Sequence, residues 1–215
     1  MTKYLIINAD DFGLSTIFNE VTLDLIRKGL ISSTTVMVNR VTDNQKEQFE
    51  KLINLSKNKN LSIGIHLEFE ENDYPSQIKS QYEKFKDVLG FNPSHLDIHK
   101  TSTHRGSISS VADFCKDKKI PCRNKGGNVD YFKTTDSPLF HGSVEDFDKI
   151  VEWIKTIEDG KYYEISFHPG KFDPSCKSSL NKDRERDVEH IKKLNSILEE
   201  NNIKVVSYFD LAATS

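Results

Sequence analysis

Short apolar runs alternate with amphipathic stretches along most of the chain. Runs rich in branched and aromatic residues predict strands at residues 4–8, 34–39, 61–69, 95–98, 120–123, 163–167 and 204–208. Stretches with helical spacing predict helices at residues 15–28, 43–57, 78–89, 107–118, 144–157 and 184–200. Because strands that alternate with helices form parallel βαβ units, the pattern predicts an α/β protein.

Local signals support several of these boundaries. Ile78, Tyr82, Phe85 and Leu89 recur at steps of four, three and four, and Gly90 then ends the helix. Ser143 followed by Asp146 resembles a capping box, which predicts the start of the helix at 144–157. Residues 124–142, with the sequence NKGGN near their start, are the longest irregular segment and are expected to form a binding loop or an extra hairpin.

Two architectures fit this order of elements. One is a distorted, TIM-like (β/α) barrel with mostly parallel strands, and the other is an open doubly wound sheet. A length of 215 residues suits one α/β domain, so residues 1–215 are expected to form a single domain. We favour the barrel because of where the unusual polar residues fall.

Composition limits the possible binding partners and the cellular compartment of the protein. The net charge is −3, from 30 basic and 33 acidic residues, so no strong positive field is available to bind nucleic acid. The three cysteines, Cys115, Cys122 and Cys176, form no C-x-x-C pair and predict no disulfide framework. No stretch approaches the roughly 20 apolar residues of a membrane span. We therefore expect a cytoplasmic protein without a membrane partner.

Aspartate and histidine follow four separate predicted strands. They stand at the carboxyl ends, where α/β proteins place their active sites, at Asp10, Asp11, His66, His99 and His168. Each residue alone has an ordinary explanation, such as a turn or a buried histidine. Together, two imidazoles and one carboxylate form a suitable ligand set for a catalytic divalent metal. Adjacent residues on an extended chain point in different directions, so Asp10 and Asp11 need not have the same role.

The motifs also occur in a characteristic order. NADDFG, RKGLISSTTVMVN, IGIHLE, HLDIH, HPG and VVSYFDL, spread over residues 4–211, resemble the YdjC-like carbohydrate deacetylase family, which includes chitooligosaccharide deacetylases. The resemblance implies a distorted (β/α) barrel and the hydrolysis of an N-acetyl group on an amino sugar or oligosaccharide. It further implies one divalent metal ion, Mg²⁺ or Zn²⁺, at Asp11, His66 and His99. Asp10 would be the general base and His168 the general acid.

Other residues have weaker assignments. Arg123, after a short predicted strand, is where the family carries an arginine that could orient the base, although a surface arginine is equally consistent. Phe12, Phe69 and Phe172 follow the same strand ends and could hold a sugar or simply pack. The chain departs from the family's His-rich run, because Lys100 and Thr101 follow His99 and only His104 comes later. Phe209 stands where the family's late motif has arginine.

Two other functions remain open at this stage. A metal-dependent phosphoesterase on a similar barrel would need two or more ions, with His95, Asp97 and His104 as further ligands. A non-catalytic sugar-binding or metal-binding protein would not need a base and an acid beside the ligands. The sequence leaves the oligomeric state open, with a homodimer among the expected assemblies.

Overall fold

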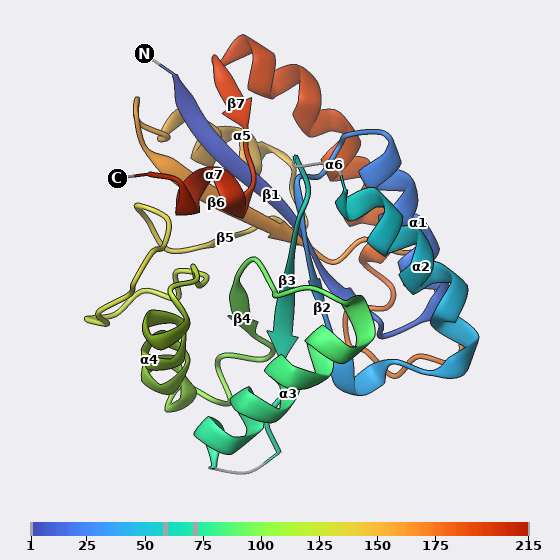
Figure 1. Ribbon diagram of the computed structural model, residues 1–215. Helices are drawn as coiled ribbons and strands as arrows, with labels where there is room; N and C mark the ends of the chain where they lie inside the picture. Colours follow the sequence, from blue (N-terminus) through green and yellow to red (C-terminus); the bar gives the residue numbers. More distant parts are fainter. Residues whose placement is uncertain (1, 58–59, 71–72, 215) are drawn as a thin grey trace.

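Seven parallel strands form one curled sheet (Figure 1) in the computed structural model, which describes residues 2–57, 60–70 and 73–214. The sheet order is β4-β3-β2-β1-β6-β5, and β7 pairs with the beginning of β1. The strands are β1 Lys3–Phe12, β2 Ser33–Val36, β3 Ser62–Leu67, β4 Leu96–Ile98, β5 Phe140–His141, β6 Tyr162–Phe167 and β7 Ile203–Val205.

Helices follow most of the strands and cover the outside of the sheet (Figure 1). They are α1 Thr16–Arg27, α2 Lys46–Ser56, α3 Tyr74–Leu89, α4 Ser107–Lys118, α5 Asp148–Lys155, α6 Arg184–Glu200 and α7 Tyr208–Ala212. Two short 3-10 turns, Val38–Arg40 and Asp43–Gln45, precede α2. No helix in the described part of the chain is long and apolar enough to cross a bilayer.

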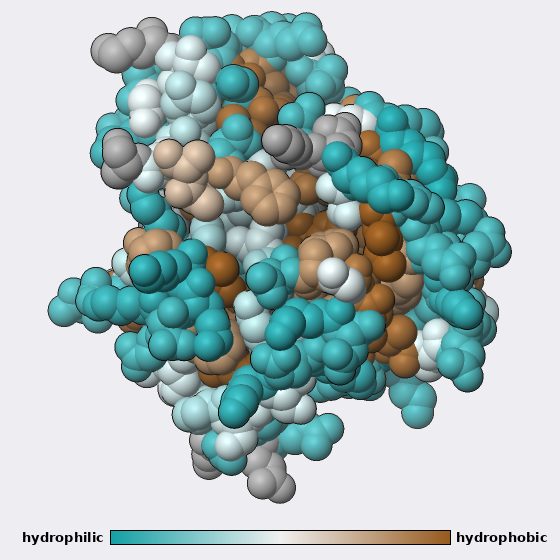
Figure 2. Space-filling view, in the orientation of Figure 1, coloured by the Kyte–Doolittle hydropathy of each residue, from teal (hydrophilic) through white to brown (hydrophobic). Residues whose placement is uncertain are grey.

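Apolar side chains form two clusters between the sheet and its helices. One joins β1 to β4 with α2, α3 and α4, and the other joins β1 and β6 with α5 and α6. On the face shown in Figure 2, hydrophilic residues dominate the outer rim and hydrophobic residues come to the surface mainly toward the centre. A third cluster of Ile6, Val206, Tyr208 and Leu211 places α7 across one end of the sheet interior. The other end is left for polar side chains.

The curled sheet is closed by a segment that is not a strand. Residues 121–124 lie against β4 through the Leu96–Cys122 bridge and the bond from the Arg123 backbone N–H to the Leu96 carbonyl, 3.0 Å. On the other side, the Leu139 N–H donates to the Asn124 carbonyl at 3.0 Å, just before β5. This segment therefore lies between the two edge strands and brings Arg123 into the interior.

The barrel prediction is confirmed, and several element boundaries are corrected. Residues 120–123 form a single bridge instead of a strand. Isolated hydrogen bonds, and not a continuous ladder, join this segment to the chain on either side of it. β1 extends beyond the strand predicted at 4–8 and ends at Phe12, and the strand predicted at 34–39 ends at Val36. The last strand ends at Val205, where α7 follows. β5 and α7 have no counterpart among the predicted elements.

The capping-box prediction for α5 is wrong. The helix begins at Asp148, whose backbone N–H donates to Asp146 Oδ1 at 3.0 Å and not to Ser143. The hydroxyl of Ser143 instead contacts side chains far along the sequence, which are described below.

Candidate active site

Asp10 and Asp11 reach the same cavity because β1 is irregular at this point. Its register with β2 shifts between Ala9 and Phe12, and Asp11 has a φ of +71°. Neighbouring side chains of a regular strand point to opposite faces, and a bulge changes that alternation. Both carboxylates consequently line the cavity at the carboxyl end of the sheet. A left-handed backbone is uncommon for a residue other than glycine, and such strain clusters at functional sites.

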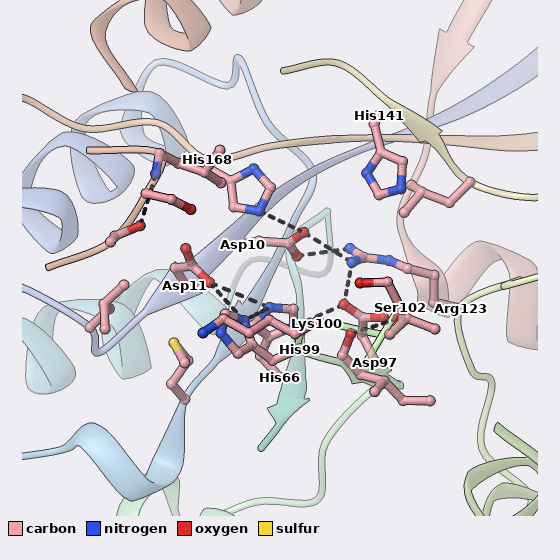
Figure 3. A pocket seen from close by; sticks show the side chains of 18 of the residues that line it. Asp10, Asp11, His66, Asp97, His99, Lys100, Ser102, Arg123, His141 and His168 are labelled. Carbon is pink, nitrogen blue, oxygen red and sulfur yellow. Dashed lines mark hydrogen bonds and ion pairs between the residues drawn. The ribbon is translucent and has the colours of Figure 1, made fainter. Parts of the chain in front are cut away.

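Three side chains from three strand ends converge beside Asp10 (Figure 3). Asp11 Oδ1 lies 3.4 Å from His66 Nε2 and 3.7 Å from His99 Nδ1, and those two nitrogens are 3.1 Å apart. Asp11 Oδ1 is buried and has no hydrogen-bond partner among the residues that the structure describes. Two imidazole nitrogens and an unsatisfied carboxylate oxygen fit one divalent cation.

Side chains behind this triad fix its orientation. His66 Nδ1 lies 2.8 Å from Asp97 Oδ2, so the other ring nitrogen, Nε2, faces Asp11. Carboxylates commonly orient metal-binding histidines in this way. Arg184 at the start of α6 donates from Nη2 to Asp11 Oδ2 at 2.6 Å and leaves Oδ1 free. The Arg184 side chain is fully buried, with its guanidinium 3.9 Å from the ring centre of Phe18.

The three groups of the triad have shifted acid–base equilibria. Burial lowers the pKa of His66, but the carboxylates of Asp10, Asp11 and Asp97 outweigh it and raise that pKa to about 10. Burial and the neighbouring His66 lower the pKa of His99 to about 4. Burial would raise the pKa of Asp11, yet His66 and other positive groups hold it well below its usual range. At neutral pH these shifts keep Asp11 ionised and His99 neutral, and a bound cation would displace the proton of His66.

Asp10 is held by a dense set of hydrogen bonds. Its Oδ1 accepts from Asn8 Nδ2 at 2.7 Å, Thr35 Oγ1 at 2.8 Å and Arg123 Nη2 at 2.9 Å. Its Oδ2 accepts from Arg123 Nη1 at 3.0 Å and faces His168 Nε2 at 3.8 Å across the cavity (Figure 3). Burial raises the pKa of Asp10, but the guanidinium of Arg123 outweighs it and the pKa falls to about 2.

Arg123 is the centre of a buried charge network. Besides Asp10, it pairs with Asp97 and donates from Nε to Glu164 Oε1 at 3.0 Å. The Tyr208 hydroxyl of α7 donates to Glu164 Oε2 at 2.6 Å, so the C-terminal helix supports the network from behind. Arg123 is therefore buried, donates to both oxygens of Asp10 and is not a surface arginine.

His168 follows β6 and is held from its other side. Its Nδ1 lies 2.9 Å from the Ser143 hydroxyl, which in turn donates to Asp187 Oδ2. The backbone N–H of His168 donates to the same Asp187 oxygen at 2.8 Å. Its Nε2 therefore points toward Asp10 and the cavity (Figure 3).

The predicted aromatic contacts lie elsewhere. Phe12 is only 1% exposed and packs edge-on against Phe49 in the core. Phe69 packs against Tyr74 and His104, and neither it nor the exposed Phe172 is among the residues that line the cavity. We therefore assign no substrate contact to these three phenylalanines. The cavity of about 740 Å³ is instead lined by polar side chains and by residues 98–102, 123–125, 138, 139, 141 and 176–180.

Of the extra ligands considered for a second metal ion, only Asp97 approaches the triad. His95 is buried, with its ring stacked on that of Tyr208 at 3.6 Å, and His104 lies against Phe69. Sequence reasoning missed Arg184, Asp187, Ser143 and Glu164. Arg184 and Asp187 lie in the first turn of α6, whose sequence is typical of a charged, exposed helix. Their burial therefore depends on tertiary contacts alone.

The chain matches the family described as YdjC-like protein over residues 4–80 and 70–199. The chain belongs to the YdjC-like family. This YdjC-like chain is 28% identical over 249 residues to carbohydrate deacetylase 2 of Listeria innocua, covering 96% of the chain and 98% of the relative. It is also 28% identical to the carbohydrate deacetylase of Clostridium beijerinckii, over 96% of the chain and 99% of that protein. A chitooligosaccharide deacetylase of Yersinia pestis is 28% identical over 57% of the chain and 60% of the relative.

Solved structures support the fold of this YdjC-like protein. A proposed cellobiose-phosphate cleavage protein of Enterococcus faecalis superposes with a TM-score of 0.81 at 20% identity, covering 98% of the chain and 99% of the other. A polysaccharide deacetylase of Bacillus cereus gives a TM-score of 0.60 at 12% identity, over 96% and 92% of the two chains. At these identities the likeness concerns the fold.

Proposed function

We propose that this chain hydrolyses the N-acetyl group of an acetylated amino sugar or oligosaccharide, with one divalent metal ion held by Asp11, His66 and His99. The observation that carries the proposal is the pairing of Asp10 and His168 across the cavity, 3.8 Å apart, beside three convergent ligand atoms. Two relatives named carbohydrate deacetylase, which align with this chain over nearly their whole length, support it.

The proposed metal ion and the side chains around it have separate roles in the reaction. When bound, the ion would polarise the acetyl carbonyl and make a water molecule more acidic. Two imidazoles favour Zn²⁺ over Mg²⁺, because Mg²⁺ prefers oxygen ligands. The triad leaves room on the cavity side for substrate, since these residues line a cavity that is open to solvent.

Asp10 is the proposed general base. Its pKa of about 2 keeps it ionised at neutral pH, and Arg123 holds its Oδ2 toward the cavity. From this position Asp10 accepts the proton of the attacking water. His168, on the other side, donates a proton to the leaving nitrogen, because an amine leaves poorly unless it is protonated. The cavity thus contains a base and an acid that simple binding does not require.

The phosphoesterase alternative is less well supported. A second group of possible ligands, formed by Asp10, His66 and Asp97, does exist. However, the guanidinium of Arg123 already pairs with both carboxylates of that group, and Lys125 Nζ lies 2.6 Å from Asp97 Oδ1. A second cation there would be repelled by two buried or nearly buried positive charges. One ion per chain is the expected count.

The test is acetate release from N-acetylglucosamine and its short β-1,4 oligomers, with the metal removed and then restored. We expect chelation to abolish acetate release and a single equivalent of Zn²⁺ to restore it. The metal content is measured on the same sample, and an aryl phosphate serves as the competing substrate. Phosphate release with two ions per chain would favour the phosphoesterase, and acetate release that survives complete chelation would overturn the metal mechanism.

A further inference from the structure

The contacts of His168 define the direction of each hydrogen bond around it. Asp187 Oδ2 accepts from the Ser143 hydroxyl and from the backbone N–H of His168. A carboxylate at neutral pH has no proton and can only accept. Ser143 has a single hydroxyl proton, and this proton points to Asp187. Toward the imidazole, 2.9 Å away, the hydroxyl oxygen can therefore only accept.

From this direction we infer that Ser143 is a positioning residue that, together with Asp187, keeps a proton on Nδ1 of His168. Nε2 is then the nitrogen that gains and loses a proton, and it faces the cavity and Asp10. The inference rests on the proposed function for its catalytic meaning. The hydrogen-bond direction itself follows from the geometry.

The same arrangement suits a general acid. In the charged ring both nitrogens carry protons, and Ser143 accepts the Nδ1–H. The Nε2 proton passes to the amide nitrogen as the carbon–nitrogen bond breaks and its electron pair stays on nitrogen. The ring is left neutral with its Nδ1 proton, and Ser143 and Asp187 neither gain nor lose one. Between turnovers, solvent returns a proton to Nε2 and removes the one that Asp10 took from water.

A purely structural explanation of Ser143 is weaker. The residue precedes α5, where serine often caps a helix, but the first backbone N–H of α5 donates to Asp146 and not to Ser143. Its hydroxyl instead joins the segment after β5 to the end of β6 and the first turn of α6. A structural link alone would not require the imidazole as a partner.

The direct test is the tautomer of neutral His168, read from long-range nitrogen–proton NMR spectra of the full chain labelled with ¹⁵N-histidine at alkaline pH. The signal is assigned by its loss in His168→Gln. We expect a protonated Nδ1 and an unprotonated Nε2. Because this measurement uses the unmodified chain, it decides the proposal even if a variant fails to fold. A protonated Nε2 with a bare Nδ1 would overturn it.

Substitutions of Ser143 extend the test. Ser143→Ala removes the acceptor, so the spectrum should change to a mixture of both tautomers. Ser143→Thr keeps the hydroxyl and should keep the Nδ1 proton. Ser196→Ala, at an exposed serine of α6 whose hydroxyl donates to the Lys193 carbonyl, is the matched control. An unchanged tautomer in folded Ser143→Ala would also overturn the inference.

Kinetics separate this inference from the proposed function. In Ser143→Ala we expect kcat for acetate release to fall roughly 10- to 100-fold, within the range that acid–base catalysis contributes. KM and zinc affinity should stay the same, and Ser143→Thr should recover most of the rate. If the tautomer is as expected but no acetylated sugar is turned over, the proposed function fails and the positioning role stands. A full rate in folded Ser143→Ala would refute the catalytic part.

Discussion

At the scale of single residues, Arg123 has the largest electrostatic role in the site. It is almost fully buried and pairs with Asp10, Asp97 and Glu164. Removing one partner from a buried ion pair leaves an uncompensated charge, which typically costs about 3–5 kcal/mol. The network therefore couples the stability of the barrel interior to the ionisation of the proposed base.

The substitution Arg123→Met should lower the free energy of unfolding by about 3–5 kcal/mol at pH 8. The deficit should become smaller as the pH falls. In the wild type, the pKa of Asp10 is lowered to about 2 from 3.8, so its stabilising effect is present above pH 4 and is lost as the pH falls toward 2. In the variant, protonation removes the unpaired negative charges, so burying these carboxyl groups costs less free energy at lower pH. Urea unfolding of both metal-free proteins at pH 8 and pH 5 measures the difference. A deficit that grows at pH 5 would contradict this explanation.

Sequence reasoning identified the aspartates and histidines because each stands at the end of an apolar run. It could not show that Asp10 and Asp11 face one cavity, since this depends on a bulge in β1 and a φ of +71° at Asp11. Arg184 and Ser143 were missed for a different reason. Their partners, Asp11 and His168, are distant in sequence, and no local pattern indicates those contacts.

At the scale of elements, α7 supports the site from the closed end of the barrel. Tyr208 donates to Glu164 and stacks on His95, whose ring lies over β3 at Gly64. A Cβ atom at Gly64 would meet that ring at 2.5 Å, so the stack requires glycine there. The strand predicted at 204–208 reached the first residue of α7 because VVSY is rich in β-forming residues, and the capping box formed by Ser207 and Asp210 was overlooked.

The substitution Tyr208→Phe should lower the free energy of unfolding by about 1–3 kcal/mol, because it leaves a buried carboxylate oxygen of Glu164 without its donor. The control is Phe209→Ala, one residue later on the same helix, where the side chain is 48% exposed. This control should change stability by no more than about 0.5 kcal/mol. Thermal and urea unfolding of both variants give the comparison. Equal effects would mean that the hydroxyl is not what stabilises α7.

The irregular segment 124–142 contributes its two ends to the cavity. Asn124, Lys125, Pro138, Leu139 and His141 line it, whereas the residues between them do not. The sequence pattern correctly indicated irregular structure but not the short strand β5, whose two residues pair with β6.

The substitution His141→Ala should raise KM for the acetylated sugar by roughly 2- to 13-fold, the range for losing one hydrogen bond of about 0.5–1.5 kcal/mol. The affinity for zinc should not change, because His141 belongs to no group of possible metal ligands. Steady-state kinetics and a zinc titration provide the measurement. A lower kcat with unchanged KM would move His141 from substrate binding to the chemical step.

At the scale of the whole molecule, the proposed metal ligands join three strands that are distant in sequence. Asp11 lies on β1, His66 on β3, and His99 follows β4. The alternation of strands and helices predicted parallel βαβ units, and the polar residues at the strand ends favoured the barrel over an open sheet. Its closure by residues 121–124 could not, because isolated hydrogen bonds leave no periodic pattern. A single domain over residues 1–215 stays a prediction.

A cation that binds the folded chain alone should stabilise the whole barrel. At a free Zn²⁺ concentration 100 times its Kd, the gain is about 2.7 kcal/mol. Differential scanning calorimetry of metal-free and zinc-loaded protein should therefore show a higher Tm with zinc. His104→Ala, outside the triad, should show the same increase, whereas His99→Ala should show little. An equal increase in both variants would place the ion elsewhere.

The account depends most on the different roles of Asp10 and Asp11, and one paired experiment tests this directly. Zinc binding and acetate release are measured together for the wild type, Asp10→Asn and Asp11→Asn, with N-acetylglucosamine oligomers as substrate. Asp10→Asn should bind zinc with nearly unchanged affinity and lose about 10²–10⁴-fold in kcat, the usual contribution of a general base. Asp11→Asn should lose zinc affinity first and activity as a consequence. If Asp10→Asn loses the metal while Asp11→Asn keeps it, or if Asp10→Asn retains full activity at saturating zinc, the proposed roles are contradicted.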